Sequence, residues 1–171
     1  MRTLLLKRLV QGPLTEPAPA PDEAALAELA ARVDRAARRR LGRSLSIREV
    51  DAGSCNGCEL EIHALNNILY DLERFGLRFV ASPRHADVLV VTGPVTRNMR
   101  EALSRTYAAT PDPKWVVAVG DCARDGGLFA PSAACVGGVS QVVPVDLHIA
   151  GCPPTPHALL TGLLALLDIC R

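Results

Sequence analysis

Short apolar runs alternate with helix-like patterns over most of the chain after residue 44. Five runs combine branched apolar residues with Gly, Pro or Asp near their ends, as β-strands do: SIREV, LRFVA, DVLVVTG, WVVAVG and VVPVDLHIA. Several of them are nearly continuous in apolar residues, which is typical of parallel strands covered on both faces. The pattern therefore predicts an α/β fold, a mostly parallel sheet with helices on both faces.

Three helices are expected between or after these strands. The first carries an apolar stripe that Gly76 ends and that consists of Ile62, Leu65, Leu69 and Leu72. The second is expected to begin after Thr96 as its capping residue and to run to about Tyr107. The third opens at Pro156 and is rich in leucine.

The chain before residue 44 has a different character. Residues 1–21 combine a short amphipathic segment, LLLKRLV, with a proline-rich linker. Residues 22–43 have the pattern of a basic amphipathic helix, with apolar residues at helical spacing and Arg38, Arg39 and Arg40 before Gly42. We expect this helix to cover one side of the core, while contact with an acidic partner or a membrane surface is the alternative for its basic face. The main domain is then expected to fill residues 44–171.

Composition narrows the classes of function. The 171 residues have a formal net charge of +1, so the overall positive field of a nucleic-acid-binding protein is missing. No apolar run is long enough to predict a membrane-spanning helix, and the start lacks the long apolar region and cleavage site of a signal peptide. The six cysteines are therefore expected in a reducing cytoplasm, where metal binding or catalysis is a commoner role than a disulfide.

Four of the six cysteines follow the ends of predicted strands. Cys55 and Cys58 come after SIREV, Cys122 after WVVAVG, and Cys152 after VVPVDLHIA. The carboxyl ends of parallel strands meet at one edge of a sheet, and that edge is where functional crevices form. The four thiols are therefore expected to converge there.

Thiolates that lie close together repel one another unless a cation separates them, so a metal centre is the expected use of this edge. Structural zinc usually takes two closely spaced pairs, whereas Cys122 and Cys152 stand alone in the sequence. An iron–sulfur cluster can take its ligands from separate loops. The residues favour a cluster but leave a zinc site and a thioredoxin-like dithiol open. Cys135 and Cys170 lack this placement and are interpreted as bystanders. Cys135 is expected in a glycine-rich connection before a strand, as a small buried side chain, and Cys170 lies at the last turn of the chain.

Four separated motifs occur in a characteristic order: SCNGCELE, SPRHADVLVVTGPVT, VGDCARDGG and VPVDLHIAGCPPTP. Over residues 44–169 the chain resembles the small subunit of membrane-bound, energy-converting [NiFe] hydrogenases and formate hydrogenlyases. That family is similar to the 20 kDa subunit of the respiratory NADH:quinone oxidoreductase. The resemblance implies a flavodoxin-like fold and one [4Fe–4S] cluster with Cys55, Cys58, Cys122 and Cys152 as ligands. It implies no catalytic residue in this chain.

The resemblance also implies an electron-transfer role. The cluster is expected next to the active site of a large [NiFe] hydrogenase-type subunit and is expected to exchange electrons with a ferredoxin-like iron–sulfur subunit. Integral membrane subunits are expected in the same complex, with this chain peripheral on the cytoplasmic side of the cell membrane. Nucleic acid is not an expected partner.

Two other functions stay open. One is a quinone-reducing subunit of a complex I-type NADH dehydrogenase. The respiratory subunit usually carries two adjacent cysteines in the first motif, whereas this chain has Cys-x-Gly-Cys, which favours the hydrogenase type. The other is a structural zinc or interaction module without redox chemistry.

The remaining polar residues near the motifs receive plainer interpretations. The two acidic residues after the first cysteine pair, Glu59 and Glu61, suit the start of a helix and are not expected to be catalytic. The histidines are interpreted as ordinary structural residues: His63, His85, His148 and His157. The charges beside Cys122 are interpreted as facing solvent: Asp121, Arg124 and Asp125.

Overall fold

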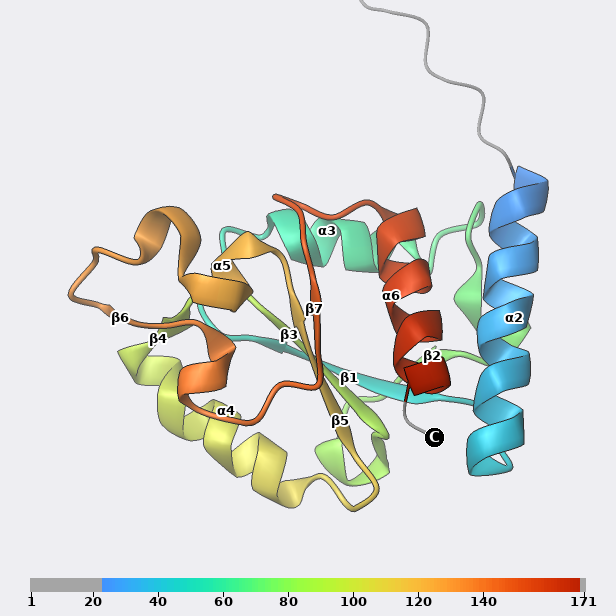
Figure 1. Cartoon of the computed structure of the whole chain (residues 1–171), viewed down its shortest axis with the longest axis horizontal. Coiled ribbons are helices and arrows are strands. Elements are labelled where there is room, and N and C mark those ends of the chain that lie inside the picture. Colours follow the sequence, from blue (N-terminus) through green and yellow to red (C-terminus); the bar gives the residue numbers. More distant parts are fainter. Residues whose placement is uncertain (1–22, 170–171) are drawn as a thin grey trace, which may run out of the picture.

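Five parallel strands form the main sheet of the computed structural model, which describes residues 23–169 (Figure 1). In spatial order they are β2 (Arg78–Phe79), β1 (Ser46–Asp51), β3 (Val88–Thr92), β5 (Trp115–Val119) and β7 (Leu147–Ile149). All neighbouring pairs in this sheet are parallel. Numbered among themselves along the chain, these strands have the order 2-1-3-4-5 of flavodoxin-like folds. The predicted α/β fold and flavodoxin-like sheet are confirmed.

Both faces of the sheet are buried, because successive side chains of a strand point to opposite sides. On β3, Val88 and Val90 join one core cluster, while Leu89 and Val91 join the other. The first cluster contains residues of α2 (Glu23–Leu41), α3 (Gly57–Ala64) and α6 (Pro156–Ile169). The second contains residues of α4 (Arg97–Ala109) and α5 (Asp121–Asp125). The continuous apolar strands of the sequence are thus explained by two separate cores.

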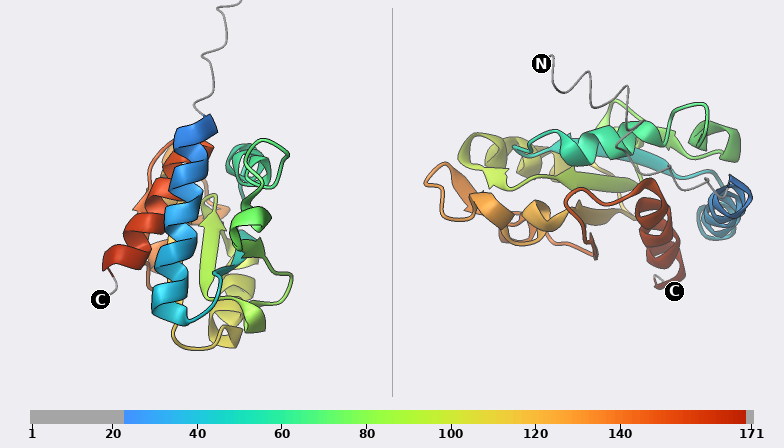
Figure 2. Two further views of the ribbon diagram at one scale, coloured as in Figure 1. Left: turned by 90° about the vertical axis from the view of Figure 1, so that its right-hand side faces the viewer. Right: turned by 90° about the horizontal axis from the view of Figure 1, so that it is seen from above.

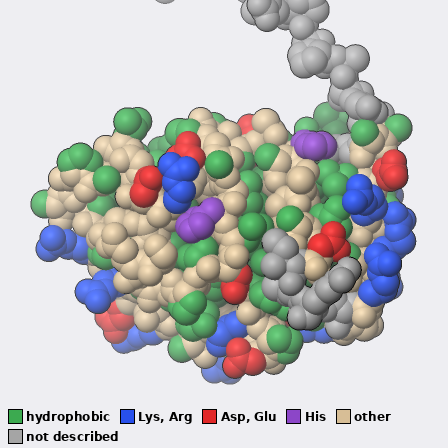
Figure 3. Space-filling view, in the orientation of Figure 1, with side chains coloured by type: hydrophobic (Ala, Val, Ile, Leu, Met, Phe, Trp, Pro, Cys, Tyr) green, Lys and Arg blue, Asp and Glu red, His purple; other side chains and the backbone are tan. Residues whose placement is uncertain are grey.

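Helix α2 confirms the predicted basic amphipathic helix. Leu29, Val33 and Ala37 are buried, and α2 lies alongside α6 (Figure 2). Arg38 and Arg39 are exposed, and basic side chains gather over this part of the molecule (Figure 3). The helix therefore covers one side of the core, as expected.

The helix predicted from the apolar stripe before Gly76 is shorter in the structure than expected. Helix α3 ends at Ala64, and Leu69 is 59% exposed. The side-chain oxygen of Asn67 accepts hydrogen bonds from the backbone N–H groups of Leu69 (2.9 Å) and Tyr70 (3.1 Å). This local bonding competes with a helix, and the chain continues through a turn before the apolar pattern resumes.

Two predicted strands are shorter than their apolar runs. Strand β2 contains only Arg78 and Phe79, and β7 begins at Leu147. Before β7, Pro144 has no N–H to donate to a ladder, and the carboxylate of Asp146 accepts the Val116 N–H at 2.7 Å. Side-chain bonding thus replaces part of the expected strand pairing.

The remaining elements are short. A second sheet, absent from the prediction, pairs β4 (Val95–Thr96) and β6 (Cys135–Gly137) in antiparallel fashion. Strands of two or three residues give no periodic signal, which is why the sequence did not predict them. The 3₁₀ helices are η1 (Leu72–Phe75), η2 (Pro83–His85), η3 (Gly127–Phe129) and η4 (Val139–Gln141).

The helix starts were predicted closely. Helix α6 begins at Pro156, and the Thr155 hydroxyl accepts a hydrogen bond from the Ala158 N–H at 3.3 Å. Helix α4 begins after Thr96, but the Thr96 hydroxyl donates to the Ala52 carbonyl at 3.2 Å and makes no bond to the helix. The expected segment over residues 1–21 and the bystander Cys170 lie outside the described residues.

The core makes a prediction about stability. Leu160 of α6 is fully buried against the sheet, whereas Ile68 in the loop after α3 is 95% exposed. Leu160→Ala should lower the free energy of unfolding by about 2–5 kcal/mol, because it removes buried contacts and leaves a cavity. Ile68→Ala should change it by less than about 0.5 kcal/mol. Urea unfolding followed by circular dichroism measures both, and equal effects would contradict the assigned core.

Candidate metal centre

The carboxyl ends of the central strands lie in one row. Asp51 of β1 pairs with Thr92 of β3, and Thr92 pairs with Val119 of β5. Val119 in turn pairs with Ile149 of β7. Loops that are far apart in the sequence therefore leave the sheet from neighbouring positions on one edge.

Four cysteines enter this edge from three loops. Cys55 lies between β1 and α3, and Cys58 lies in the first turn of α3. Cys122 lies in α5 directly after β5, and Cys152 lies between β7 and α6. Cys55 and Cys152 are exposed, Cys58 and Cys122 are half-buried, and all four are free thiols.

The thiols lie close enough to influence one another. Burial is the largest cause that raises the pKa of Cys58 to about 12, and repulsion from the Glu59 carboxylate is the next. The remaining causes are the other three thiols, those of Cys55, Cys122 and Cys152. Like charges in a poorly solvated place disfavour the thiolate form. The structure thus brings together the same four cysteines that the sequence singled out.

Cys122 has a similar environment. Burial is the main cause that raises its pKa, followed by the thiols of Cys152 and Cys55. The backbone N–H of Leu128 acts in the opposite direction, because its hydrogen bond favours the thiolate. A thiol must lose its proton to bind a metal, and a bound cation would relieve the repulsion among these sulfurs.

The described side chains do not mark out a site for a single metal ion. Within residues 23–169, no three His, Cys, Asp or Glu side chains are arranged to hold a metal ion. A tetrahedral zinc ion needs its sulfur ligands at about 2.3 Å from one centre. The candidate centre is therefore defined by the shared edge of the sheet and by the thiols that raise the pKa of Cys58 and Cys122.

The loop that carries Cys55 is held by its own side chains. The Asp51 carboxylate accepts hydrogen bonds from the N–H groups of Gly53 (2.7 Å) and Ser54 (2.8 Å). The Ser54 hydroxyl accepts the Asn56 N–H at 3.1 Å, and Asn56 has a φ of 72°. These bonds stabilise a tight turn between β1 and α3, of the kind that Asp, Ser and Asn favour.

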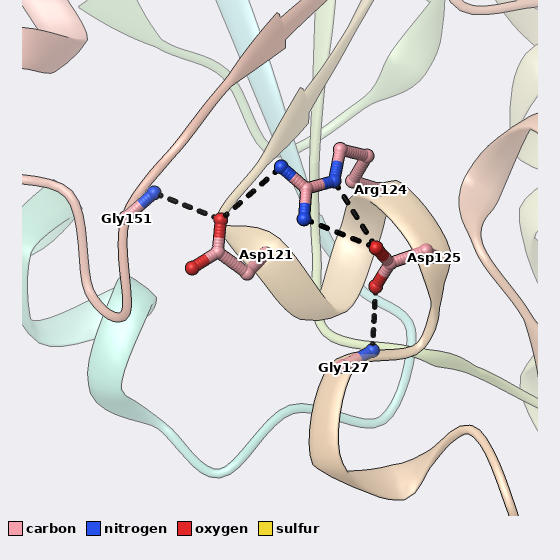
Figure 4. Close-up of polar contacts among 5 residues, drawn as sticks. All are labelled: Asp121, Arg124, Asp125, Gly127 and Gly151. Carbon is pink, nitrogen blue, oxygen red and sulfur yellow. Dashed lines mark hydrogen bonds and ion pairs between the residues drawn. The ribbon is translucent and has the colours of Figure 1, made fainter.

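The charges beside Cys122 face solvent as predicted, with Arg124 and Asp125 exposed and Asp121 partly exposed, but they are also bonded to one another. Figure 4 shows Asp121, Arg124 and Asp125 linked to one another and to two glycine N–H groups. Arg124 donates to the Asp125 carboxylate from two nitrogens, each at 3.1 Å. The Gly127 N–H, at 2.9 Å, and then Arg124 hold the pKa of Asp125 below its usual range. The group is partly exposed, but it organises the loop.

Glycines lie against two of the sulfurs. A Cβ atom on Gly120 would lie 2.7 Å from the Cys58 sulfur, and one on Gly127 would lie 2.9 Å from the Cys122 sulfur. Both glycines have positive φ, 88° for Gly120 and 50° for Gly127. Any larger residue would displace the sulfur atoms, so the backbone here is shaped around the thiols.

Comparison with known proteins agrees with this geometry. Residues 55–166, which include all four cysteines, match the family model described as NADH ubiquinone oxidoreductase, 20 Kd subunit. The chain belongs to this family.

Relatives in the family are subunits of oxidoreductase complexes. Formate hydrogenlyase subunit 7 of Escherichia coli is 47% identical over 131 residues, covering 77% of this chain and 51% of that protein. A probable membrane-bound hydrogenase subunit of Pyrococcus furiosus is 46% identical over 128 residues, covering 75% of this chain and 77% of that protein. The chain thus spans about half the length of the first relative.

A solved structure agrees with the fold. A chain of the membrane-bound sulfane sulfur reductase, described as an archaeal respiratory membrane complex, is 34% identical with a TM-score of 0.66. The match covers 81% of this chain and 75% of that one. The resemblance to the complex I-type and hydrogenase-type family is thereby confirmed.

Burial of Glu59 was not predicted. It lies in the first turn of α3, as expected, but it is only 6% exposed, and neither carboxylate oxygen has a hydrogen-bond partner among the described residues. Glu49 of β1 lies nearby: burial is the main cause that raises its pKa, while the charge of His63 lowers it and that of Glu59 raises it. All four histidines are exposed: His63, His85, His148 and His157. Sequence spacing places Glu59 on α3 but gives no signal of its burial.

Cys135 differs from its prediction in position. It was expected in a connection before a strand, but it lies within β6, where it is half-buried rather than fully buried. It is not among the thiols that shift the pKa of Cys58 or Cys122. Its interpretation as a bystander to the four-cysteine group stays a prediction.

The glycine contacts predict an effect of a single methyl group. Gly127→Ala should displace the Cys122 sulfur and lower metal affinity about 10- to 100-fold, as changes beside a metal ligand do. Gly42 offers a matched control, because its φ is also positive (68°) but nothing lies within 4 Å of its Cβ position. Both variants carry similar backbone strain, roughly 1–2 kcal/mol. Metal content per folded chain measures the difference, and equal losses in both variants would mean that strain alone is responsible.

Proposed function

We propose that this chain is an electron-transfer subunit of a membrane-associated oxidoreductase complex and carries one [4Fe–4S] cluster. The ligands are Cys55, Cys58, Cys122 and Cys152. One observation carries the proposal: four free thiols from three loops converge at one edge of the sheet, where the other three raise the pKa of Cys58 and two of them raise that of Cys122. The family match over residues 55–166 supports it independently.

The residues at this edge suit such a cofactor chemically. When bound by four cysteine thiolates, a [4Fe–4S] cluster can accept and donate one electron. The chain supplies the four thiols, and the Leu128 N–H supplies a hydrogen bond to the Cys122 sulfur. The first turn of α3 carries Cys58, where the positive end of the helix dipole favours a thiolate. Each of these contacts stabilises negative charge on sulfur.

A cluster suits the placement of the cysteines along the chain better than zinc does. Structural zinc usually takes two closely spaced pairs of ligands, whereas Cys122 and Cys152 each come alone from a separate loop. A cluster of four irons is larger than one ion and takes each cysteine at a different corner. A structural zinc or interaction module is the alternative that metal analysis distinguishes.

The surface around the site supports contact with a partner. The sulfur-bearing residues Cys55 and Cys152 are exposed, so a neighbouring redox centre can approach. Large apolar side chains are also exposed on the elements that carry Cys58 or follow Cys122: Leu60 (62%), Leu128 (89%) and Phe129 (42%). Exposed apolar side chains beside a functional edge are typical of a subunit interface.

The relatives favour a hydrogenase-type complex. The partner at this edge is then a large [NiFe] hydrogenase-type subunit, with electrons passing to or from a ferredoxin-like iron–sulfur subunit. Integral membrane subunits would anchor the complex, with this chain peripheral on the cytoplasmic side. None of the helices within residues 23–169 has both the length and the apolar character needed to span a bilayer.

A quinone-reducing role is the second candidate, because the matching family model is that of the NADH ubiquinone oxidoreductase subunit. The Cys-x-Gly-Cys spacing of Cys55 and Cys58 favours the hydrogenase type. A quinone-dependent signal in the intact complex, together with absence of nickel, would favour the quinone-reducing role.

The ligand set predicts the outcome of single substitutions. Purified anaerobically with its partner subunits, the chain should contribute about four irons, four sulfides and one reduced-cubane EPR signal to the total of the complex. Cys152→Ala should lower the iron and sulfide of the complex by about four each and remove that one signal. Cys135→Ala should keep all three, because Cys135 lies in β6 outside the group of interacting thiols.

Zinc without iron or sulfide in the native chain would overturn the cluster. Equal loss in the Cys152 and Cys135 variants would contradict the ligand set. Nickel in the co-purified partner subunit distinguishes the hydrogenase-type complex from the other candidate.

A further inference from the structure

Two hydrogen bonds join Asp121 and Gly151 in both directions. The Asp121 N–H donates to the Gly151 carbonyl at 3.0 Å, and the Gly151 N–H donates to the Asp121 carboxylate at 3.2 Å. Just before them, the Gly120 N–H donates to the Ile149 carbonyl at 2.8 Å. The pairing of β5 with β7 is therefore continued beyond the ends of both strands, and its last bond is made by a side chain.

Both residues stand directly before a proposed ligand. Asp121 precedes Cys122, and Gly151 precedes Cys152. The loops of these two cysteines come from different parts of the chain, and no disulfide joins them. The bonds between Asp121 and Gly151 therefore fix the distance between the two loops directly before each cysteine.

We propose that Asp121 is a positioning residue that fastens the Cys122 loop to the Cys152 loop in the arrangement that binds the cluster. The proposal rests on the proposed function, and it gives the Asp121 carboxylate a role that its exposed position alone does not suggest. Preorganised ligand loops lose less conformational entropy when they bind a cofactor, which raises affinity without a new contact to it.

Arg124 is not required for this link. Its strongest partner is Asp125, at 3.1 Å from two nitrogens, whereas its nearest approach to Asp121 is 3.8 Å (Figure 4). Both side chains of the longer pair are partly exposed, so their attraction is weak. We therefore expect the two bonds between Asp121 and Gly151 to stay in place when Arg124 is removed.

The Gly151 side of the link consists of backbone alone, and the Asp121 side contributes the side chain. Gly151 has a φ of 140°, and a Cβ atom there would lie 2.6 Å from the Pro154 Cα. The backbone at Gly151 therefore lies directly against Pro154, with no room for a side chain at this position. A carboxylate at position 121 reaches the Gly151 N–H from the neighbouring loop.

The test compares three variants with the unaltered chain, each purified anaerobically within its complex. Asp121→Ala removes the acceptor, Asp121→Asn keeps an oxygen acceptor without the charge, and Arg124→Gln removes only the longer ion pair. Iron and sulfide are quantified, and loss of visible absorbance in excess chelator is timed after subtracting that of the complex with Cys152→Ala, which supplies the background from partner clusters. Circular dichroism reports whether each variant is folded, and an EPR-monitored redox titration gives the midpoint potential.

Asp121→Ala should lose its cluster to chelator about tenfold faster than the unaltered chain, the scale expected for one hydrogen bond to a charged group. Asp121→Asn should regain most of the resistance to chelator that Asp121→Ala loses. Its midpoint potential should be higher, because a negative charge near the cluster has been removed. Arg124→Gln should resist chelator as the unaltered chain does.

Chelator resistance in folded Asp121→Ala equal to that of the unaltered chain would overturn the proposal. So would failure of Asp121→Asn to recover resistance, or a loss in Arg124→Gln as large as that in Asp121→Ala. If the unaltered chain itself holds no iron or sulfide, the proposed function fails instead, and the two failures are therefore distinguishable.

Discussion

Parallel pairing of the central strands is the constraint on which the rest of the structure depends. Because β1, β3, β5 and β7 run in one direction, their carboxyl ends form a single row from Asp51 to Ile149. Every loop that leaves this row starts within a few strand spacings of the others. Cysteines separated by long stretches of sequence can therefore share one site without any long structured loop. The two buried cores on either side of the sheet keep this row in place.

Convergence of the thiols has a cost that the protein meets locally. Half-burial and mutual repulsion raise the pKa of Cys58 and Cys122, so the site favours protons or a cationic centre over free thiolates. Glycines leave room for the sulfurs. The Asp51 carboxylate holds the loop of Cys55, and the Asp121 carboxylate joins the loop of Cys122 to that of Cys152. These features belong together, because a site built from separate loops must be ordered before it binds. We propose that this edge faces a partner subunit.

The prediction from sequence succeeded for elements marked by a repeating apolar pattern. It failed where a single side chain determines where an element ends. Long apolar runs and helix-start residues gave the sheet, the helix order and the position of the four cysteines. The end of α3 was missed because it depends on one Asn67 oxygen that bonds two backbone N–H groups. The β4–β6 pair was missed because its strands are too short for a period to appear. Burial of Glu59 and the link from Asp121 to Gly151 depend on neighbours distant in sequence.

By itself, the sequence determined that the chain is an α/β domain with a parallel sheet and that four cysteines follow strand ends. Both conclusions rest on local order along the chain, since strand type and loop position follow from which residues are adjacent. Only the tertiary structure decided how the thiols face one another, which glycines lie against the sulfurs, and which carboxylate joins two loops. Those features are distances between segments that strand pairing alone brings together, and no spacing in the sequence encodes them.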